Sequence, residues 1–138
     1  MATTSRRDFT RTLLREQCYL CFMRPTDKPL PVGRTAADIR AEHHDYLVGL
    51  ERSGVLFAAG PFVDETGARH GAGLIILRVR TRAEAETIAF AEPYTKLGLR
   101  TMELTPWQRN EGVLNLKLRF ADGVLEVDNR TYALKPRE

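Results

Sequence analysis

The sequence lacks an apolar run long enough to cross a membrane. A membrane-spanning helix needs about 18 or more consecutive apolar residues, and even the run over residues 74–77 ends at Arg78. Arg6 and Arg7 resemble the start of a twin-arginine export signal, but Arg15 and Glu16 fall in the segment that such a signal keeps apolar. We therefore expect a cytoplasmic protein that makes no membrane contact.

Cysteine is also scarce, with Cys18 and Cys21 as its two occurrences. Their C-x-x-C spacing suits metal or redox chemistry in some contexts. Here both lie in a run of strand-forming residues, where positions i and i+3 point to opposite faces of a sheet. Because no second C-x-x-C or H-x-x-x-H accompanies them, we expect two strand residues and no metal site.

Positive charges outnumber negative charges only slightly. The formal net charge is +3, and the pI is about 9.1, which attracts anions weakly. Only Arg7, Arg11 and Arg15 would share one face of a helix, and no RNA-recognition pattern of aromatic and basic residues accompanies them. We expect a solvated N-terminal arm over residues 1–16 and no nucleic-acid partner.

The length and composition predict one globular domain. The chain has 138 residues, of which 43% are hydrophobic and 28% charged, close to ordinary globular usage. After the arm, we expect the main body to occupy residues 17–107. Residues 108–138 then form a β extension of the same domain.

The first half of the body predicts a strand, a long loop and a helix. The strand covers residues 17–23, and the proline-rich loop over residues 24–34 is long enough to be a wall or lid of a site. Thr35 and Asp38 then signal a helix start, and Gly54 its end. Within this helix one apolar face holds four residues at helical spacing: Ile39, His43, Leu47 and Leu50.

The second half adds two strands, a helix and a last strand. Residues 55–59 and 72–80 read as an antiparallel pair, and Thr81 with Glu84 predicts a capped helix over residues 82–91. A short helical turn follows, with Glu92 as its cap and Gly98 as its stop. Residues 100–106 alternate as a strand, which gives the order β-α-β-β-α-β.

This order defines a ferredoxin-like α+β sandwich, with helices on one face of a four-stranded antiparallel sheet. The other face still carries apolar side chains that need cover. A second subunit commonly provides that cover in this architecture. We therefore expect a homodimer.

The C-terminal extension has a pattern of its own. Leu114, Leu116, Leu118 and Phe120 alternate with polar residues, and residues 121–123 form a turn. This predicts a β-hairpin or short meander, whose return over residues 124–134 is interrupted at Asp128-Asn129. Two roles stay open, because the extension could extend the sheet or bind the partner subunit.

Several motifs together resemble one known family. They are His43-x-x-x-Leu47-x-x-Leu50-x-x-x-Gly54-x-Leu56-x-x-Ala59-Gly60-Pro61, Gly73-Leu74-Ile75-Ile76, the helix over residues 83–89, Glu92-Pro93-Tyr94-x-x-x-Gly98-Leu99, and Thr105-Pro106-Trp107. In order and spacing they resemble the YCII, or YciI-like, family over residues 17–107. The resemblance implies a ferredoxin-like dimeric α/β barrel with a pocket built around a histidine and an aspartate. Its enzymes include a dehydrochlorinase of a chlorinated hydroxyquinone.

By motif, the family histidine falls on His43 and the family aspartate on Glu92. Glutamate keeps the carboxylate but adds one methylene. A buried histidine beside a carboxylate is a proton-transfer group, because burial and the negative charge act in opposite directions on its proton affinity. Such a base can remove a proton next to a carbonyl without a cofactor.

The resulting hypothesis is a lyase or isomerase that acts on a small cyclic ketone, lactone or quinone, with His43 and Glu92 as catalytic residues. A non-catalytic ligand-binding or interaction module of the same fold is the alternative, and a lone histidine is often only a hydrogen-bonded core residue. We expect His44 to be solvated and His70 to lie in a surface turn, so the histidines do not form a metal site.

Six further residues are candidates for substrate binding. Glycine lets a ligand approach the backbone closely, and aromatic rings suit a flat ligand, although each of these residues also has an ordinary structural explanation. An arginine could receive an anionic substituent, although a solvated loop arginine is the commoner situation. The candidates are Gly60, Pro61, Phe62, Tyr94, Trp107 and Arg24.

Overall fold

The computed structural model describes residues 15–137. The predicted N-terminal arm over residues 1–16, with Arg7 and Arg11, lies almost wholly outside the described residues. The chain divides into two compact units, one ending at Arg109 and the other including everything from Asn110 onward. No helix among residues 15–137 is long and apolar enough to cross a membrane.

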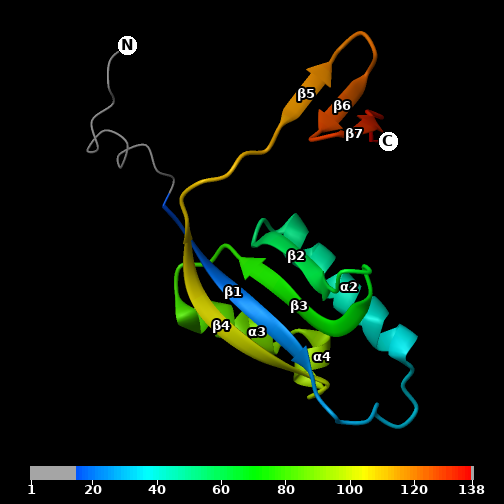
Figure 1. Ribbon diagram of the computed structural model, residues 1–138, viewed down its shortest axis with the longest axis vertical. Coiled ribbons are helices and arrows are strands. Elements are labelled where there is room, and N and C mark those ends of the chain that lie inside the picture. Colours follow the sequence, from blue (N-terminus) through cyan, green and yellow to red (C-terminus); the bar gives the residue numbers. More distant parts are fainter. Residues whose placement is uncertain (1–14, 138) are drawn as a thin grey trace. The chain divides into compact units, whose positions relative to one another are not determined.

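The first unit is an antiparallel sheet with helices (Figure 1). The strands pair in the order β2-β3-β1-β4, and every neighbouring pair is antiparallel. The α+β class and the predicted β-α-β-β-α-β order are confirmed, as is the short helical turn expected before the last strand. In chain order the elements are β1 (Glu16–Pro25), α2 (Ala36–Arg52), β2 (Leu56–Val63), β3 (Arg69–Leu77), α3 (Arg82–Phe90), α4 (Pro93–Lys96) and β4 (Arg100–Arg109).

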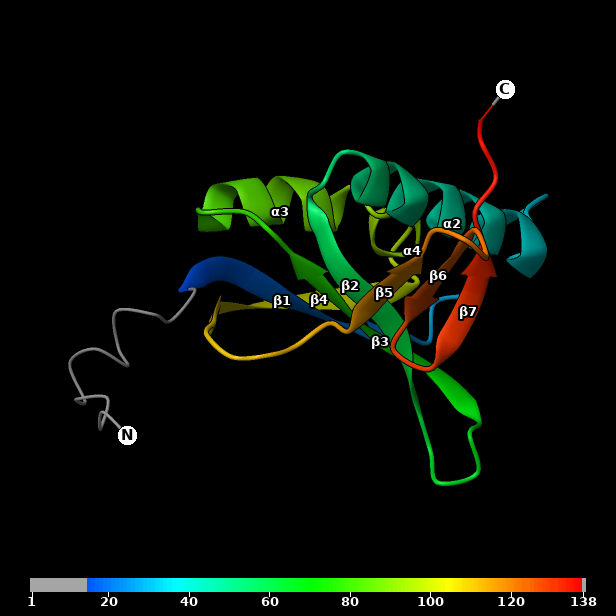
Figure 2. The same ribbon diagram turned by 90° about the horizontal axis from the view of Figure 1, so that it is seen from above.

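The helices all lie on one face of this sheet (Figure 2). The core between the two layers is formed by alternate residues of the strands, by Val79 after β3 and by two alanines of α3. Its members are Tyr19, Cys21, Met23, Ile75, Leu77, Val79, Ala85, Ala89 and Leu104. From α2, Ile39 is fully buried, and Leu47 and Leu50 pack against the core. The apolar helix face predicted from the sequence is therefore the face that meets the sheet.

Local capping explains where these helices begin. Thr35 and Asp38 form a reciprocal capping box at the start of α2, and Gly54 follows its end with φ 78°. The hydroxyl of Thr81 accepts a hydrogen bond from the backbone N–H of Glu84 at the start of α3. These helix starts were predicted correctly because each depends on a few neighbouring residues.

The hairpin of β2 and β3 is longer than predicted. Gly60 and Pro61 lie within β2, opposite Leu74 and Gly73, and do not form a turn. An added Cβ on Gly73 would lie 3.0 Å from the backbone oxygen of Gly60, so a glycine is needed where these strands approach. Strand pairing over these residues thus overrides the local tendency of glycine and proline to end a strand.

The turn of this hairpin is organised by Asp64. Its carboxylate accepts hydrogen bonds from the backbone and hydroxyl of Thr66, the backbone of Ala68 and Nε2 of His70. Hydrogen bonds from Thr66 first, then from His70 and Ala68, hold the pKa of the Asp64 carboxyl well below its ordinary value. His70 is therefore exposed, as predicted, but lies at the start of β3 and serves this turn.

The two cysteines are free and buried on opposite faces of β1. Cys21 belongs to the helix-facing core, whereas Cys18 lies on the other face, opposite Trp107 of β4. Among the residues that the structure describes, no group of three histidine, cysteine or acidic side chains is placed to hold a metal ion.

The second unit contains a three-stranded sheet of its own. It consists of β5 (Leu116–Arg119), β6 (Val124–Val127) and β7 (Arg130–Ala133), in that order and all antiparallel. The interruption expected at Asp128-Asn129 is the turn between β6 and β7, where Asp128 has φ 51°. The extension is therefore a meander that does not add strands to the first sheet, and its inclusion in one domain with the body stays a prediction.

Candidate active site

His43 lies in the middle of α2, on the face that meets the sheet. It is one turn after the buried Ile39 and one turn before Leu47, which packs against the core. Its side chain is 16% exposed, so most of the ring is shielded from solvent while one part remains accessible. This is the placement that a proton-transfer group needs.

Glu92 forms the N-cap of α4. A glutamate is an uncommon N-cap residue, yet its carboxylate accepts hydrogen bonds from two backbone N–H groups of the first turn. Oε1 accepts from Tyr94 at 3.1 Å, and Oε2 accepts from Thr95 at 2.9 Å. The Thr95 hydroxyl donates a third bond to Oε2 at 2.8 Å. The predicted cap is confirmed, and it fixes the orientation of the carboxylate.

A fourth hydrogen bond joins Glu92 to His43. The distance between His43 Nδ1 and Glu92 Oε1 is 2.6 Å. Glu92 is completely buried, and burial raises the pKa of its carboxyl. The hydrogen bonds from His43, Thr95 and Tyr94 together outweigh that effect and leave the pKa below its ordinary value.

These bonds also determine which nitrogen of His43 carries a proton. An ionised carboxylate can only accept hydrogen bonds, so Nδ1 of His43 is the donor. In the neutral ring, Nε2 then has the lone pair and can accept a proton. The extra methylene of Glu92, relative to the family aspartate, therefore does not prevent the contact.

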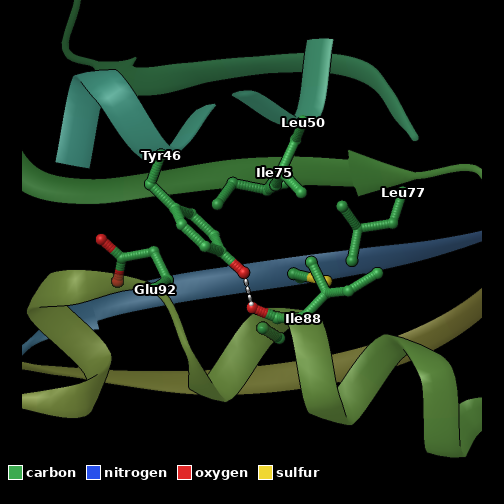
Figure 3. A pocket seen from close by; sticks show the side chains of 8 residues that line it. Tyr46, Leu50, Ile75, Leu77, Ile88 and Glu92 are labelled. Carbon is green, nitrogen blue, oxygen red and sulfur yellow. Dashed lines mark hydrogen bonds between the residues drawn. The ribbon is translucent and has the colours of Figure 1, made fainter. Parts of the chain in front are cut away.

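The other side of Glu92 faces tightly packed apolar side chains. Figure 3 shows Glu92 beside the ring of Tyr46 of α2, with its carboxylate directed away from the pocket that it lines together with Leu50, Ile75, Leu77 and Ile88. The Tyr46 hydroxyl donates to the backbone oxygen of Ile88 at 2.6 Å. Burial, and then the charge of Glu92, raises the pKa of Tyr46. Glu92 is thus isolated from water on this side, and its hydrogen bonds lie on the other.

A cleft of about 680 Å³ opens beside His43, within the size range of sites for small ligands. Its lining combines the middle of α2 with paired residues of β2 and β3. The lining residues are Met23, Arg40, His43, His44, Leu47, Ala59, Gly60, Pro61, Arg69, Gly71, Ala72, Gly73, Leu74, Ile75, Tyr94 and Arg100.

Four of the predicted site residues meet at this cleft. Gly60, Pro61 and Tyr94 line it together with His43. The rings of His43 and Tyr94 contact edge-on, with centroids 5.2 Å apart. His44 is exposed, as predicted, and also lines the cleft.

Three other predicted residues do not line the cleft. Arg24 follows the core residue Met23 in β1, so alternation directs it to the other face of the sheet. Trp107 lies opposite Cys18 on that same face. Phe62 stacks on Phe22 there, with ring centroids 6.3 Å apart.

The proline-rich loop also lies away from the cleft lining. The Thr26 hydroxyl donates to the backbone oxygen of Gly98 at 2.7 Å, and Lys28 Nζ donates to that of Leu97 at 2.9 Å. The loop therefore anchors the end of α4, the helix whose cap is Glu92. It does not form the wall of the cleft that the sequence suggested.

Sequence reasoning missed three arginines of the cleft: Arg40, Arg69 and Arg100. Arg40 could have been found, since it lies one helical turn before His43. Arg69 and Arg100 give no such local signal. They reach the cleft because β3 and β4 begin at its edge.

The fold and the hydrogen-bonded histidine beside a cleft define a class: a ferredoxin-like α+β protein with a candidate acid/base site. Comparison with family models places a YCII-related domain at residues 18–108. The chain therefore belongs to the YCII-related family, as its motifs predicted.

One solved structure supports the fold assignment. It is 5-chloro-2-hydroxyhydroquinone dehydrochlorinase from Burkholderia phenoliruptrix AC1100 in complex with 2,5-dihydroxybenzoquinone. The match has a TM-score of 0.52 and 21% sequence identity, and it covers 69% of this chain and 95% of the other. No curated protein matches the sequence. At this identity the likeness establishes a shared fold.

Proposed function

We propose that this protein is a cofactor-independent lyase or isomerase that uses His43 as acid/base and Glu92 as its orienting partner. The substrate is a small cyclic ketone, lactone or quinone bound in the cleft. The observation that carries the proposal is the 2.6 Å hydrogen bond between His43 Nδ1 and a buried carboxylate. With Nδ1 bound to Glu92, Nε2 of His43 is free to accept a proton from a ligand in the cleft.

The proposed step begins with the substrate carbon next to a carbonyl. Nε2 of His43 takes a proton from this carbon, and the electron pair of the C–H bond moves into an enolate. In an elimination, the enolate expels a leaving group with its bonding pair from the neighbouring carbon, and His43 later releases the proton. In an isomerisation, His43 returns the proton to a different carbon. Glu92 stabilises the imidazolium that exists between these events.

The likeness to the Burkholderia enzyme favours this choice of chemistry. That protein is a dehydrochlorinase of a chlorinated hydroquinone, and its structure holds a dihydroxybenzoquinone. Elimination from a cyclic substrate and enolisation of a cyclic ketone both begin with removal of a proton. The proposal extends that shared step, and not the particular substrate, to this chain.

Deuterium exchange tests the proposal even when the product is unidentified. Cyclic ketones, lactones and quinones are incubated in D₂O with the wild type, and loss of C–H signals is followed by NMR. We expect exchange to fall about 10²–10⁴-fold in His43→Ala, because that variant lacks the base. His70→Ala is the control, since His70 serves the Asp64 turn. Equal exchange in wild type and His43→Ala would contradict the proposal.

The alternative, a ligand-binding or interaction module, predicts a different outcome. A module would bind a compound equally well in wild type and His43→Ala, with no exchange and no product in either. The buried hydrogen bonds of Glu92 favour the enzyme, because a binding surface does not need an oriented histidine tautomer. The same panel of compounds therefore separates the two functions.

We also propose that the protein is a homodimer. The face of the sheet opposite the helices carries Leu20, Phe22, Leu74 and Ile76, and both Phe62 and Trp107 remain exposed there. Apolar surface of this kind favours association with a second copy. Light scattering coupled to size exclusion should give twice the chain mass, and Phe62→Glu should shift the protein towards the monomer. A wild-type monomer at all concentrations would refute the dimer.

A further inference from the structure

The charge of the cleft is unbalanced. Arg40, Arg69 and Arg100 line it, and no aspartate or glutamate does so among the described residues. The carboxylate that contacts His43 is that of Glu92, whose hydrogen bonds are all directed to protein donors. Within the described part of the chain, the space open to a ligand is therefore bordered by positive charge alone.

The cleft arginines contrast with the arginines that form ion pairs. Arg34, Arg78 and Arg109 each form an ion pair with a glutamate, whereas none of the three cleft arginines has a carboxylate partner within residues 15–137. A cation that is partly removed from water and left unpaired is unfavourable. Arg100 is partly buried, whereas Arg40 and Arg69 are exposed, so Arg100 is the unpaired cation whose charge a bound anion would balance.

Arg100 is the best placed of the three to bind that anion. Its guanidinium carbon lies 3.8 Å from the centroid of the Tyr94 ring, and Nη1 lies 4.0 Å from the sulfur of Met23. Stacking on Tyr94 fixes the orientation of the Arg100 guanidinium. The N–H groups at the edge of the guanidinium are then left to bind a ligand. A planar carboxylate is the group that matches such a fork with two parallel hydrogen bonds.

Tyr94 also fixes the spacing between this cation and the base. Its ring contacts the guanidinium of Arg100 and the imidazole of His43. A single aromatic ring thus separates the anion-binding group from the proton-accepting group, and all three residues line the cleft. A ligand that reaches both must have its negative group and its reactive carbon about one ring apart.

We propose that the substrate is a small cyclic acid whose carboxylate binds Arg100, with Arg69 and Arg40 adding positive charge around the cleft. The inference rests on the proposed function of this cleft and narrows its substrate class. Recognition of the carboxylate by Arg100 places the ring beside Tyr94. The carbon next to the carbonyl then faces His43.

Benzoate and benzamide are matched probes, since they share shape and differ in charge. From its small size we expect benzoate to bind the wild type with a Kd of about 10 mM, and benzamide to bind at least about ten times more weakly because it lacks the charge. Binding is followed by chemical-shift changes of the Tyr94 and His43 rings. Benzamide binding as tight as benzoate, or no benzoate binding near that concentration, would overturn the inference.

Variants of Arg100 test whether this residue binds the carboxylate of benzoate. Arg100→Gln should weaken benzoate about tenfold or more, and Arg100→Lys should give an intermediate loss because it keeps the charge without the fork. Arg52→Gln removes the same charge from the far end of α2 and should leave the affinity unchanged. Equal losses in Arg100→Gln and Arg52→Gln would show a non-specific charge effect and refute the site.

The two proposals can fail separately. Benzoate binding could depend on Arg100 and survive in His43→Ala while no compound exchanges its protons. The proposed anion site would then be supported and the proposed enzymatic function refuted. Conversely, cyclic ketones could exchange protons in a His43-dependent way while Arg100→Gln leaves benzoate binding unchanged. The proposed enzymatic function would then be supported and the proposed cyclic-acid substrate refuted.

Discussion

Oε2 of Glu92 accepts two hydrogen bonds from a single residue, Thr95, one from its backbone N–H at 2.9 Å and one from its hydroxyl at 2.8 Å. The hydroxyl can be removed with little change of shape by Thr95→Val. Because this donor favours the ionised carboxylate, its loss should raise the pKa of Glu92 and cost about 1–3 kcal/mol of stability.

A ¹³C NMR titration of the Glu92 carboxyl measures this effect. Thr87→Val is the matched control, because the Thr87 hydroxyl bonds to the backbone of Ala83 in α3 and not to Glu92. A Glu92 pKa that is the same in Thr95→Val and Thr87→Val would show that the hydroxyl does not support the carboxylate.

Stability should depend on pH through Glu92. Its pKa is below the ordinary value of 4.5 in the folded protein, so the folded state binds this proton less readily than the unfolded state. The resulting stability is present above pH 4.5 and is lost as the pH falls through the folded-state pKa.

Glutamine at position 92 cannot titrate, which isolates this contribution. The free energy of unfolding, measured in urea, should be higher for wild type than for Glu92→Gln at pH 7. The difference should shrink as the pH falls below 4.5. A difference that stays constant between neutral and acidic pH would mean that Glu92 does not titrate as we infer.

The cysteines should resist modification in the folded protein. Burial raises the pKa of the Cys21 thiol to about 11, and burial followed by the charge of Glu16 raises that of Cys18. Since the thiolate is the reactive form, a thiol reagent at pH 8 should label neither residue until the protein unfolds. Rapid labelling of the native protein would show that β1 opens or that the thiols are accessible.

Two glycines should respond in opposite directions to alanine. Gly73→Ala places a Cβ 3.0 Å from the backbone oxygen of Gly60, and this crowding should destabilise the protein by about 1–3 kcal/mol. Gly49 lies in α2 with nothing within 4 Å of an added Cβ. Gly49→Ala should therefore stabilise by about 0.5–1 kcal/mol. Thermal denaturation of both variants tests the pair, and a stabilised Gly73→Ala would contradict the close strand approach.

Features that depend on near neighbours in the chain were predictable from the sequence. Thr35 with Asp38, and Glu92 followed by Pro93, signal helix starts within four residues, and the structure has caps at both places. The placement of His43 on the inner face of α2 followed from the spacing of its apolar neighbours.

It was harder to predict which face of the sheet each strand residue points to and which strand segments pair. Both faces of β1 carry apolar residues, so the sequence does not indicate which face of the sheet holds Phe62 and Trp107. Gly60-Pro61 favours a turn locally, but pairing with β3 keeps it in a strand. The cleft arginines come from three separate elements, and only the fold brings them together.

Glu92 has consequences for any attempt to move this site to another protein. Its carboxylate points at His43 because α4 begins there, and the end of α4 is held by Thr26 and Lys28 of the loop between β1 and α2. Grafting a histidine and a glutamate alone would transfer the two side chains without the donors that aim them. A transplant of this site would therefore also have to carry α4 and the loop that anchors it.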